Sequence, residues 1–372
     1  MKKPTSLLST CAASIILVIG IFSPANATYI FTDLGTLGGT FSQALAINNS
    51  GQVVGTAWTT GNAGSHATIW NGTTATDLTP GIPGWSSVAN SINASGQIAG
   101  NSISQFSTWD WAWRASVWNG ATVTVLSTLP GTVHSDAWAI NNYGQVAGRS
   151  IIDSDYHATV WNGANPIDLG IGSARGINDA GQVVGDSRTL SGNYHATLWN
   201  STVATNLGTL GGTSSAAYAI NNTGIIVGSS GVTGDTDHHA TLWDGAVATD
   251  LGTLGGTSSA AYAINNTGVA VGYSTTVGNA AAHATVWNGI SITDLNSLLD
   301  ANDISAGWVL EGAYGINDKG WIVGTASNKL TGLNHGFLLS DTSPVPEPAT
   351  LMLLGLGMAG LGWARRWPLV SA

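Results

Sequence analysis

Apolar residues in this chain occur in short runs, and each run is interrupted by glycine, asparagine, serine or threonine. The clearest example is 207–224, Leu-Gly-Thr-Leu-Gly-Gly-Thr-Ser-Ser-Ala-Ala-Tyr-Ala-Ile-Asn-Asn-Thr-Gly, which recurs letter for letter at 251–268. Short apolar runs at regular spacing, separated by turn-forming residues, are typical of many β-strands joined by tight turns. No segment carries a 3.6-residue apolar period of useful length, which excludes a solenoid built on helices. The pattern therefore predicts an all-β repeat protein.

The first repeated motif is an apolar run ending in Ile-Asn, followed by a turn and a second apolar run. Glycine stands three residues after each asparagine and again four residues further on. Asn-x-x-Gly between two apolar runs indicates a hairpin, because Asn and Gly accept the positive φ that tight turns require. The asparagines of its seven copies are Asn48, Asn93, Asn141, Asn178, Asn221, Asn265 and Asn317.

Two further motifs follow in fixed order. His-Ala-Thr-x-Trp-Asn-Gly alternates polar and apolar residues like a strand and ends in a hairpin turn. Its copies begin at His66, Arg114 (in place of His), His157, His195, His239, His283 and His335, the last reading His-Gly-Phe-Leu-Leu. The last motif is a short strand ending in Asp-Leu or a similar pair, at Asp33, Asp77, Val125, Asp168, Asn206, Asp250 and Asp294.

These motifs amount to four strands per repeat, and the Ile-Asn copies are spaced by 45, 48, 37, 43, 44 and 52 residues. A period of this length with four strands is typical of a propeller blade. The chain starts with a spare Asp-Leu strand at 29–34 and ends, at 335–339, one strand short. We therefore predict a seven-bladed β-propeller with four antiparallel strands per blade, whose last blade is closed by the N-terminal strand, which protects the strand edges.

The cycle of Asp-Leu-Gly, Ala-Ile-Asn-Asn-x-Gly and His-Ala-Thr-x-Trp over 29–339 resembles the bacterial extracellular repeat called the HAF family, named for His-Ala-Phe. This chain departs from that triplet by using Thr or Ser for Phe in most copies. The resemblance implies an extracellular location and assigns no chemistry.

The amino-acid composition limits the classes of molecule that the protein is expected to bind. Only 8% of the 372 residues are charged, the formal net charge is -10, and four of the ten basic residues lie in the terminal segments. Nucleic acids and anionic membrane surfaces need clustered Lys and Arg, so the composition disfavours both. The single cysteine, Cys11, lies in the N-terminal segment, which excludes a catalytic cysteine or an internal disulfide in the mature chain.

The N-terminal segment 1–27 reads as a signal peptide. Lys2 and Lys3 precede an apolar run and an Ala-x-Ala ending at Ala27, which together predict export and cleavage after that residue. The alternative is an uncleaved anchor. The repeats then occupy 28–341.

The C-terminal segment 342–372 combines Pro346-Glu347-Pro348, a short apolar run and Arg365-Arg366. This order resembles the PEP-CTERM sorting signal of bacteria that use an exosortase; the tail after the arginines is longer than expected. The resemblance implies a short transmembrane helix, transient anchoring in the inner membrane of a Gram-negative-type bacterium, cleavage near the Pro-Glu-Pro, and release to the cell surface or a biofilm matrix. A plain membrane anchor is the alternative.

Residues that recur in every repeat are predicted to be structural. The histidines are expected to hold neighbouring strands by hydrogen bonds rather than to bind metal or catalyse. The repeated Asp is expected to cap a turn. The repeated tryptophans, with Leu339 at the last site, are expected to form the core between blades: Trp70, Trp118, Trp161, Trp199, Trp243 and Trp287.

Residues that break the repeat are the candidate site. In the insertion at 107–114, an extended chain would place Trp109, Trp111 and Trp113 on one face, forming a platform that could stack on sugar rings. Trp85 is a further aromatic residue outside the repeat. The alternative is that these side chains pack over neighbouring blades.

No cofactor is expected. Two loops could contribute to a calcium site through Asp153 and Asp155 or through Asp235 and Asp237, but neither continues into a full ligand loop. Glycoside hydrolysis needs two carboxylates, and Glu311 with Asp303 is the only pair suggested for it.

The sequence thus predicts an exported, non-catalytic surface or matrix protein, with polysaccharide as the first ligand to consider. A polysaccharide hydrolase or lyase and a pure scaffold are the alternatives.

Overall fold

The computed structural model describes residues 29–79, 86–105, 111–132, 134–245 and 247–341. The chain divides into two units, Tyr29–Thr342 and a second unit made of Met1–Thr28 and Ser343–Ala372. The predicted signal peptide and sorting segment, including the predicted transmembrane helix, lie outside the described residues. Within the ranges described, no helix is long and apolar enough to cross a membrane.

The described part of the chain is built almost entirely of strands. The first are β1 (Tyr29–Asp33), β2 (Gly38–Ile47), β3 (Gln52–Thr59), β4 (Ser65–Asn71), β5 (Thr74–Asp77), β6 (Ser87–Ile92), β7 (Ile98–Gln105), β8 (Trp111–Asn119), β9 (Thr122–Val125), β10 (Ser135–Ile140), β11 (Val146–Ile152), β12 (Asp155–Asn162), β13 (Asn165–Ile177) and β14 (Gln182–Arg188). They continue with β15 (Tyr194–Asn200), β16 (Val203–Gly208), β17 (Gly211–Ile220), β18 (Ile226–Val232), β19 (His238–Asp244), β20 (Val247–Asp250), β21 (Gly255–Ile264), β22 (Val269–Thr276), β23 (Ala282–Asn288), β24 (Ser291–Asp294), β25 (Trp308–Ile316), β26 (Ile322–Asn328) and β27 (Asn334–Asp341). The helices are short: η1 (Thr60–Asn62), η2 (Val277–Asn279), η3 (Leu295–Leu298) and α1 (Ala301–Ser305).

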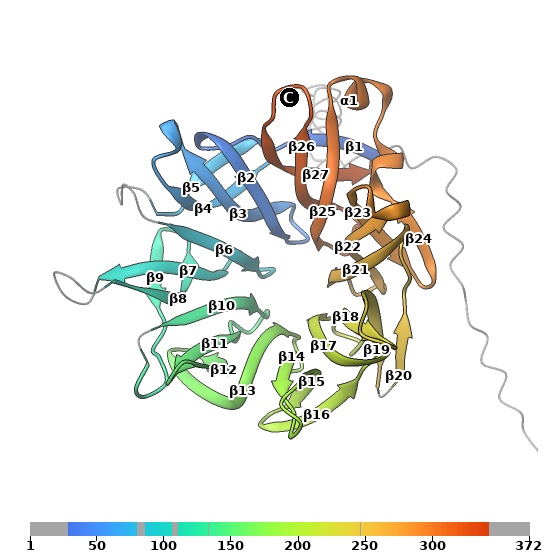
Figure 1. The fold of residues 1–372 in the computed structure, drawn as a ribbon. Coiled ribbons are helices and arrows are strands. Elements are labelled where there is room, and N and C mark those ends of the chain that lie inside the picture. The colour runs from blue at the N-terminus through green and yellow to red at the C-terminus, as the bar shows by residue number, and fades with distance from the viewer. Residues whose placement is uncertain (1–28, 80–85, 106–110, 133, 246, 342–372) are drawn as a thin grey trace, which may run out of the picture. The chain divides into compact units, whose positions relative to one another are not determined.

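The strands form separate, mainly antiparallel sheets. Three sheets have four strands each, β6–β9, β17–β20 and β21–β24, and the others have seven (β10–β16) and eight (β25–β27, β1 and β2–β5). Within this unit the sheets follow one another around a ring (Figure 1). The first strand of each repeat contacts the first strand of the next, from β2 through β6, β10, β13, β17, β21 and β25 and back to β2.

The two ends of the repeat region meet in one sheet. β1 pairs antiparallel with β27, with Tyr29 opposite Asp341 and Asp33 opposite Phe337. The prediction that the N-terminal strand lies beside the last His-containing strand is therefore confirmed.

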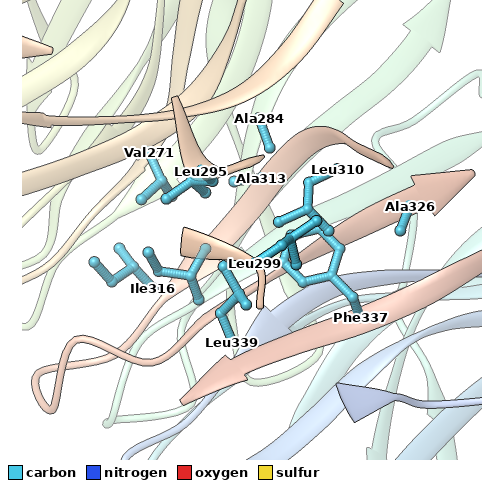
Figure 2. Packing of buried hydrophobic residues seen from close by; sticks show 11 residues of the cluster. Val271, Ala284, Leu295, Leu299, Leu310, Ala313, Ile316, Ala326, Phe337 and Leu339 are labelled. Carbon is cyan, nitrogen blue, oxygen red and sulfur yellow. The ribbon is translucent and has the colours of Figure 1, made fainter. Parts of the chain in front are cut away.

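Apolar side chains are buried between neighbouring sheets. In one cluster, Val271 and Ala284 from β22 and β23 pack against Leu310 and Phe337 from β25 and β27 (Figure 2). The repeated tryptophans lie in equivalent clusters, each no more than 1% exposed, and Leu339 is fully buried. Their predicted place in the core between repeats is confirmed.

The two repeated glycines of the Ile-Asn motif are required for different reasons. Gly224 has φ +89°, and its N–H donates to the carbonyl of Asn221, so it forms the hairpin turn. Gly228, four residues later, sits where a Cβ would come within 2.0 Å of the Ala216 carbonyl oxygen on the neighbouring strand. Only glycine allows the two strands to approach this closely.

Candidate functional site

The repeated asparagines form a closed ring of hydrogen bonds. The Nδ2 of each one donates to the backbone carbonyl of the asparagine in the next repeat, at 3.0–3.2 Å. The last of these bonds runs from Asn317 back to Asn48, so the ring closes across 269 residues. The members are Asn48, Asn93, Asn141, Asn178, Asn221, Asn265 and Asn317, all buried. We call this set the asparagine ring.

A second, more exposed ring is formed by the residue that follows each ring asparagine, and we call it the outer polar ring: Asn49, Ala94, Asn142, Asp179, Asn222, Asn266 and Asp318. The backbone N–H of Asn222 donates to the side chain of Asn266, and that of Asn266 to Asp318. The same link recurs around the ring but is missing where Ala94 replaces the polar side chain. Both rings line a central cavity of about 260 Å³.

The repeated histidines and aspartates hold adjacent strands together. His Nδ1 lies 2.6–3.1 Å from a carboxylate oxygen eleven residues further on in His66–Asp77, His157–Asp168, His239–Asp250 and His283–Asp294. The same carboxylates accept a backbone N–H two residues later and so cap the turn, as Asp250 does for Gly252 at 2.8 Å. The predicted hydrogen bonds of the histidines between strands and the predicted turn caps of the aspartates are confirmed. The second repeat has Arg114 and Val125 at these positions and thus lacks the pair altogether.

One position in the repeat varies and connects neighbouring repeats. It lies three residues before each ring asparagine and carries Leu45, Asn90, Trp138, Arg175, Tyr218, Tyr262 and Tyr314, each partly buried. The guanidinium of Arg175 lies 5.0 Å from the Trp138 ring centroid and 5.5 Å from that of Tyr218. The Tyr262 ring lies 5.4 Å from Tyr218 and 5.4 Å from Tyr314. We call Trp138, Arg175, Tyr218, Tyr262 and Tyr314 the inner row.

The inner row is continuous across five consecutive repeats. Burial, followed by the neighbouring hydroxyls of Tyr273, Tyr218 and Tyr314, raises the pKa of Tyr262 well above its ordinary value. This hydroxyl therefore remains a neutral donor and acceptor over the physiological range. Neutral aromatic rings in a row with polar tips are suited to stacking on the apolar faces of a ring-shaped ligand.

A cavity of about 440 Å³ lies against this row. Two arginines reach it from different strands, Arg149 on β11 and Arg175 on β13. The Nε of Arg149 donates to Asp136 Oδ2, and the Nε of Arg175 donates to Asp186 Oδ1, both at 2.8 Å. The lining also includes the Asp186 carboxylate, the rings of Tyr156, Tyr194, Tyr218 and His238, and small residues such as Ser214. This cavity offers aromatic faces beside two fixed cations.

A neighbouring cavity of about 300 Å³ shares Arg149 with the first. Its lining includes Trp113, His134 and Asp136. The Asp136 carboxylate is held on both oxygens, by Asn101 Nδ2 at 2.7 Å and by Arg149 Nε. The two cavities and the inner row form what we call the arginine–aromatic site.

Among the tryptophans predicted to bind, the structure describes one side chain. Trp113 is partly buried on β8 and lines the smaller cavity of the arginine–aromatic site. For Trp111 only the backbone is described, in β8 opposite Gln105. Trp109 and Trp85 lie outside the described residues, so the three-indole platform stays a prediction.

The two carboxylates considered for catalysis have separate partners. Glu311 Oε1 lies 3.2 Å from Lys329 Nζ in an exposed ion pair. Asp303 lies in α1, where its backbone N–H donates to Asp300 Oδ1 at 2.8 Å. Burial and the Asp300 charge raise the pKa of Asp303. Within the ranges described, no hydrogen bond or ion pair joins Glu311 to Asp303.

Of the carboxylates considered for calcium, Asp153 lies in a turn, Asp155 begins β12, and Asp235 and Asp237 lie in the loop before β19. Asp153 has φ +47° and Asp235 φ +53°. Asp235 Oδ1 accepts the backbone N–H of Thr213 at 2.6 Å, so it fixes a loop. Across the described ranges, no group of three or more His, Cys, Asp or Glu is arranged to hold a metal ion.

The arginine–aromatic site was not predicted from the sequence, apart from Trp113. Its signal was nevertheless present, because the residue three before each repeated asparagine changes from repeat to repeat while its neighbours stay Ala, Gly, Ser and Ile. In a repeat protein, a variable position on a conserved frame is where ligand contacts concentrate.

Comparison with known proteins supports both the export and the fold. Residues 344–366 match the PEP-CTERM protein-sorting motif. The chain is thus an exported, surface-directed protein that is sorted by an exosortase-type enzyme and processed at its C-terminus. No curated protein matches the chain. The resemblance of the repeats to the HAF family stays a prediction.

Among solved structures, the chain is similar to the β-propeller domain of the Trilobed protease from Pyrococcus furiosus, which has an open velcro topology. The TM-score is 0.50 at 10% identity, covering 83% of this chain and 100% of that one. An acylaminoacyl peptidase from Pyrococcus horikoshii is also similar, with a TM-score of 0.34 at 12% identity over 82% of this chain and 60% of that one, too distant to carry an argument. The chain therefore has an all-β fold of the propeller type.

Proposed function

We propose that the repeat region is a seven-bladed β-propeller with four strands per blade, in which β1 completes the last blade. The larger sheets divide naturally at two places. β13 pairs with β12 through its first part and with β14 through Gly172–Ile177. β27 and β2 meet at a single parallel pair, Asn334 and Phe41. Division there leaves four strands in every group, and the seven members of the asparagine ring support the same count.

On this frame, the protein acts as a non-catalytic, polysaccharide-binding component of the cell surface or extracellular matrix of a Gram-negative-type bacterium. Transient anchoring by a C-terminal transmembrane helix would precede cleavage near Pro346-Glu347-Pro348. The observation that carries the binding proposal is the larger cavity of the arginine–aromatic site, where Tyr156, Tyr194 and Tyr218 lie beside two arginines. Aromatic rings bury the apolar faces of sugars, and the adjacent charged and amide groups bond their hydroxyls.

The test uses the exported, processed protein in native gels that contain soluble polysaccharides, where binding slows migration. Tyr156→Ala and Tyr218→Ala should weaken binding about tenfold, as expected for central aromatic contacts. Tyr143→Ala, at a position 77% exposed and outside the site, serves as the matched control. If folded protein migrates unchanged across acidic and neutral polysaccharides, the binding proposal fails and a scaffold remains.

A second candidate is a polysaccharide hydrolase or lyase that uses Glu311 and Asp303. Burial and the Asp300 charge raise the pKa of Asp303, which is the direction that suits a general acid. Turnover of a bound polysaccharide that is abolished by Glu311→Gln or Asp303→Asn, with binding retained, would support this function. Binding without any release of reducing ends or unsaturated products would exclude it.

A further inference from the structure

The arginine–aromatic site has a feature beyond its aromatic character, namely two guanidinium groups around one indole. The Arg149 guanidinium lies 4.7 Å from the Trp138 ring centroid, and that of Arg175 lies 5.0 Å from it. Arg149 also lies 3.8 Å from the centroid of Tyr156. Each arginine is paired with an aspartate through Nε, so the preference for an anionic ligand comes from the remaining Nη donors and not from excess positive charge.

The partners of these arginines orient them. Asp136 and Asp186 each bind their arginine through Nε, and the Asp side chains are 19% and 10% exposed. Over the described ranges the Nη groups of Arg149 and Arg175 make no protein hydrogen bond. A guanidinium fixed at Nε, with its Nη edge open to a cavity, can form the two parallel bonds that a carboxylate accepts.

Basic residues are scarce in the rest of the repeat region, so two arginines at one cavity are unusual for this chain. Between 29 and 341 the chain has six basic residues, Arg114, Arg149, Arg175, Arg188, Lys319 and Lys329, and two of them line this one cavity. The chain as a whole carries a net charge of -10. An acidic polymer would therefore be repelled by most of the surface and held where the arginines converge.

We propose that the arginine–aromatic site recognises an acidic saccharide of the uronic-acid class. The Nη groups of Arg149 and Arg175 bind the ring carboxylate, and Tyr156, Tyr194 and Tyr218, which line the larger cavity, contact the sugar faces. This inference rests on the proposed polysaccharide-binding function and specifies its ligand.

The test compares oligogalacturonate with the same oligomer methyl-esterified at its carboxyls, by titration calorimetry on the exported, processed protein. The carboxylate form should bind at least tenfold more tightly, because esterification removes the charge and the paired acceptors. Arg175→Gln should lower the affinity for oligogalacturonate to that measured for the methyl ester. Arg175→Lys should give an intermediate affinity. Arg175 is 34% exposed, but its partner Asp186 is only 10% exposed, so Arg175→Lys, which keeps a cation beside that carboxylate, separates lost binding from lost folding.

Arg188→Gln is the matched control, since it removes the same charge from an exposed residue on the adjacent strand β14 and should leave affinity unchanged. Equal binding of acid and ester would overturn the acidic-saccharide inference while the polysaccharide-binding function stands. Binding of neither oligomer, nor of any neutral polysaccharide, would end both. If dextran sulfate binds as tightly and Arg188→Gln weakens binding as much as Arg175→Gln, the attraction is general charge and the assigned site is wrong.

Discussion

The Nδ1 of His335 lies 2.9 Å from Oδ1 of Asp33, although 302 residues separate the two along the chain. Elsewhere the same contact joins residues eleven apart, as His283 and Asp294 do at 2.6 Å. Asp33 in β1 therefore occupies, relative to His335, the position that the fourth-strand aspartate occupies in the other His–Asp pairs. The junction of the two ends reproduces the local bonding of an uninterrupted repeat.

A disulfide across this junction should stabilise the protein strongly. Ile30 and Ser340 are opposite each other in the β1–β27 pairing, so Ile30→Cys with Ser340→Cys places two thiols on adjacent strands. Because the bond closes a loop of nearly the whole repeat region, it should raise the free energy of unfolding by about 4 kcal/mol. Urea unfolding of the oxidised protein, with the reduced form as its control, measures the difference. Thiols that remain free under oxidising conditions would contradict the pairing.

The asparagine ring should contribute more to stability than the outer polar ring. Asn221 is 4% exposed, donates to Asn265 O at 3.0 Å, and accepts the N–H groups of Thr223 and Ile225. Asn221→Ala removes these three hydrogen bonds, one of them fully buried, and should lower the free energy of unfolding by about 2–4 kcal/mol. Its exposed neighbour gives the control: Asn222→Ala should cost less than about 1 kcal/mol, because Ala94 already occupies the equivalent position. Equal losses in urea unfolding would show that the ring has no special role.

The strand content, the hairpin turns and the buried tryptophans could be predicted because they repeat. A single copy of His-Ala-Thr-x-Trp is ambiguous, but its recurrence at fixed distance from Ile-Asn requires one local structure for every copy. The junction of 29–34 with 335–339 followed from motif order alone. The asparagine ring could not be predicted, because its bonds join equivalent residues of different repeats and depend on how the repeats are rotated.

The arginine–aromatic site was missed for a related reason. Arg149 and Arg175 lie on strands of different repeats and at different motif positions, so no spacing in the sequence connects them. Trp113 was noticed because it belongs to an insertion that interrupts the repeat. Variation at an ordinary repeat position, as at Tyr218, becomes informative only once the fold shows that these positions contact one another.

Two buried tryptophans should respond differently to the same substitution. Trp161 Nε1 donates to the carbonyl of Ser127 at 2.6 Å, whereas Trp199 Nε1 is buried without a partner among the described residues. Both side chains are 0% exposed, so replacement by Phe removes a similar volume from each core. Trp161→Phe should therefore cost about 1 kcal/mol more than Trp199→Phe in urea unfolding, the value of the lost hydrogen bond. A larger loss at Trp199 would contradict this bonding difference.

Acid should weaken the outer polar ring at Asp318. Burial raises the pKa of this carboxyl, but hydrogen bonds from the Asn49 side chain and from the backbone and side chain of Asn266 together outweigh burial and lower it below its ordinary 3.8. A carboxyl whose pKa is lower in the folded state stabilises the fold above its ordinary pKa and loses that contribution as the pH falls through the folded value. The free energy of unfolding should therefore fall more steeply below pH ~4 in the natural protein than in Asp318→Asn, which cannot titrate.

The substitution suits the site, because asparagine stands at the equivalent position in four other repeats, as Asn49 and Asn266 show. Urea unfolding at a series of pH values provides the measurement. Asn266→Ala gives an independent check, because it removes one hydrogen-bond donor to the Asp318 carboxylate. The pH dependence of this variant should lie between that of the natural protein and that of Asp318→Asn. Parallel pH curves for the natural protein and Asp318→Asn would mean that these hydrogen bonds do not favour the charged carboxylate.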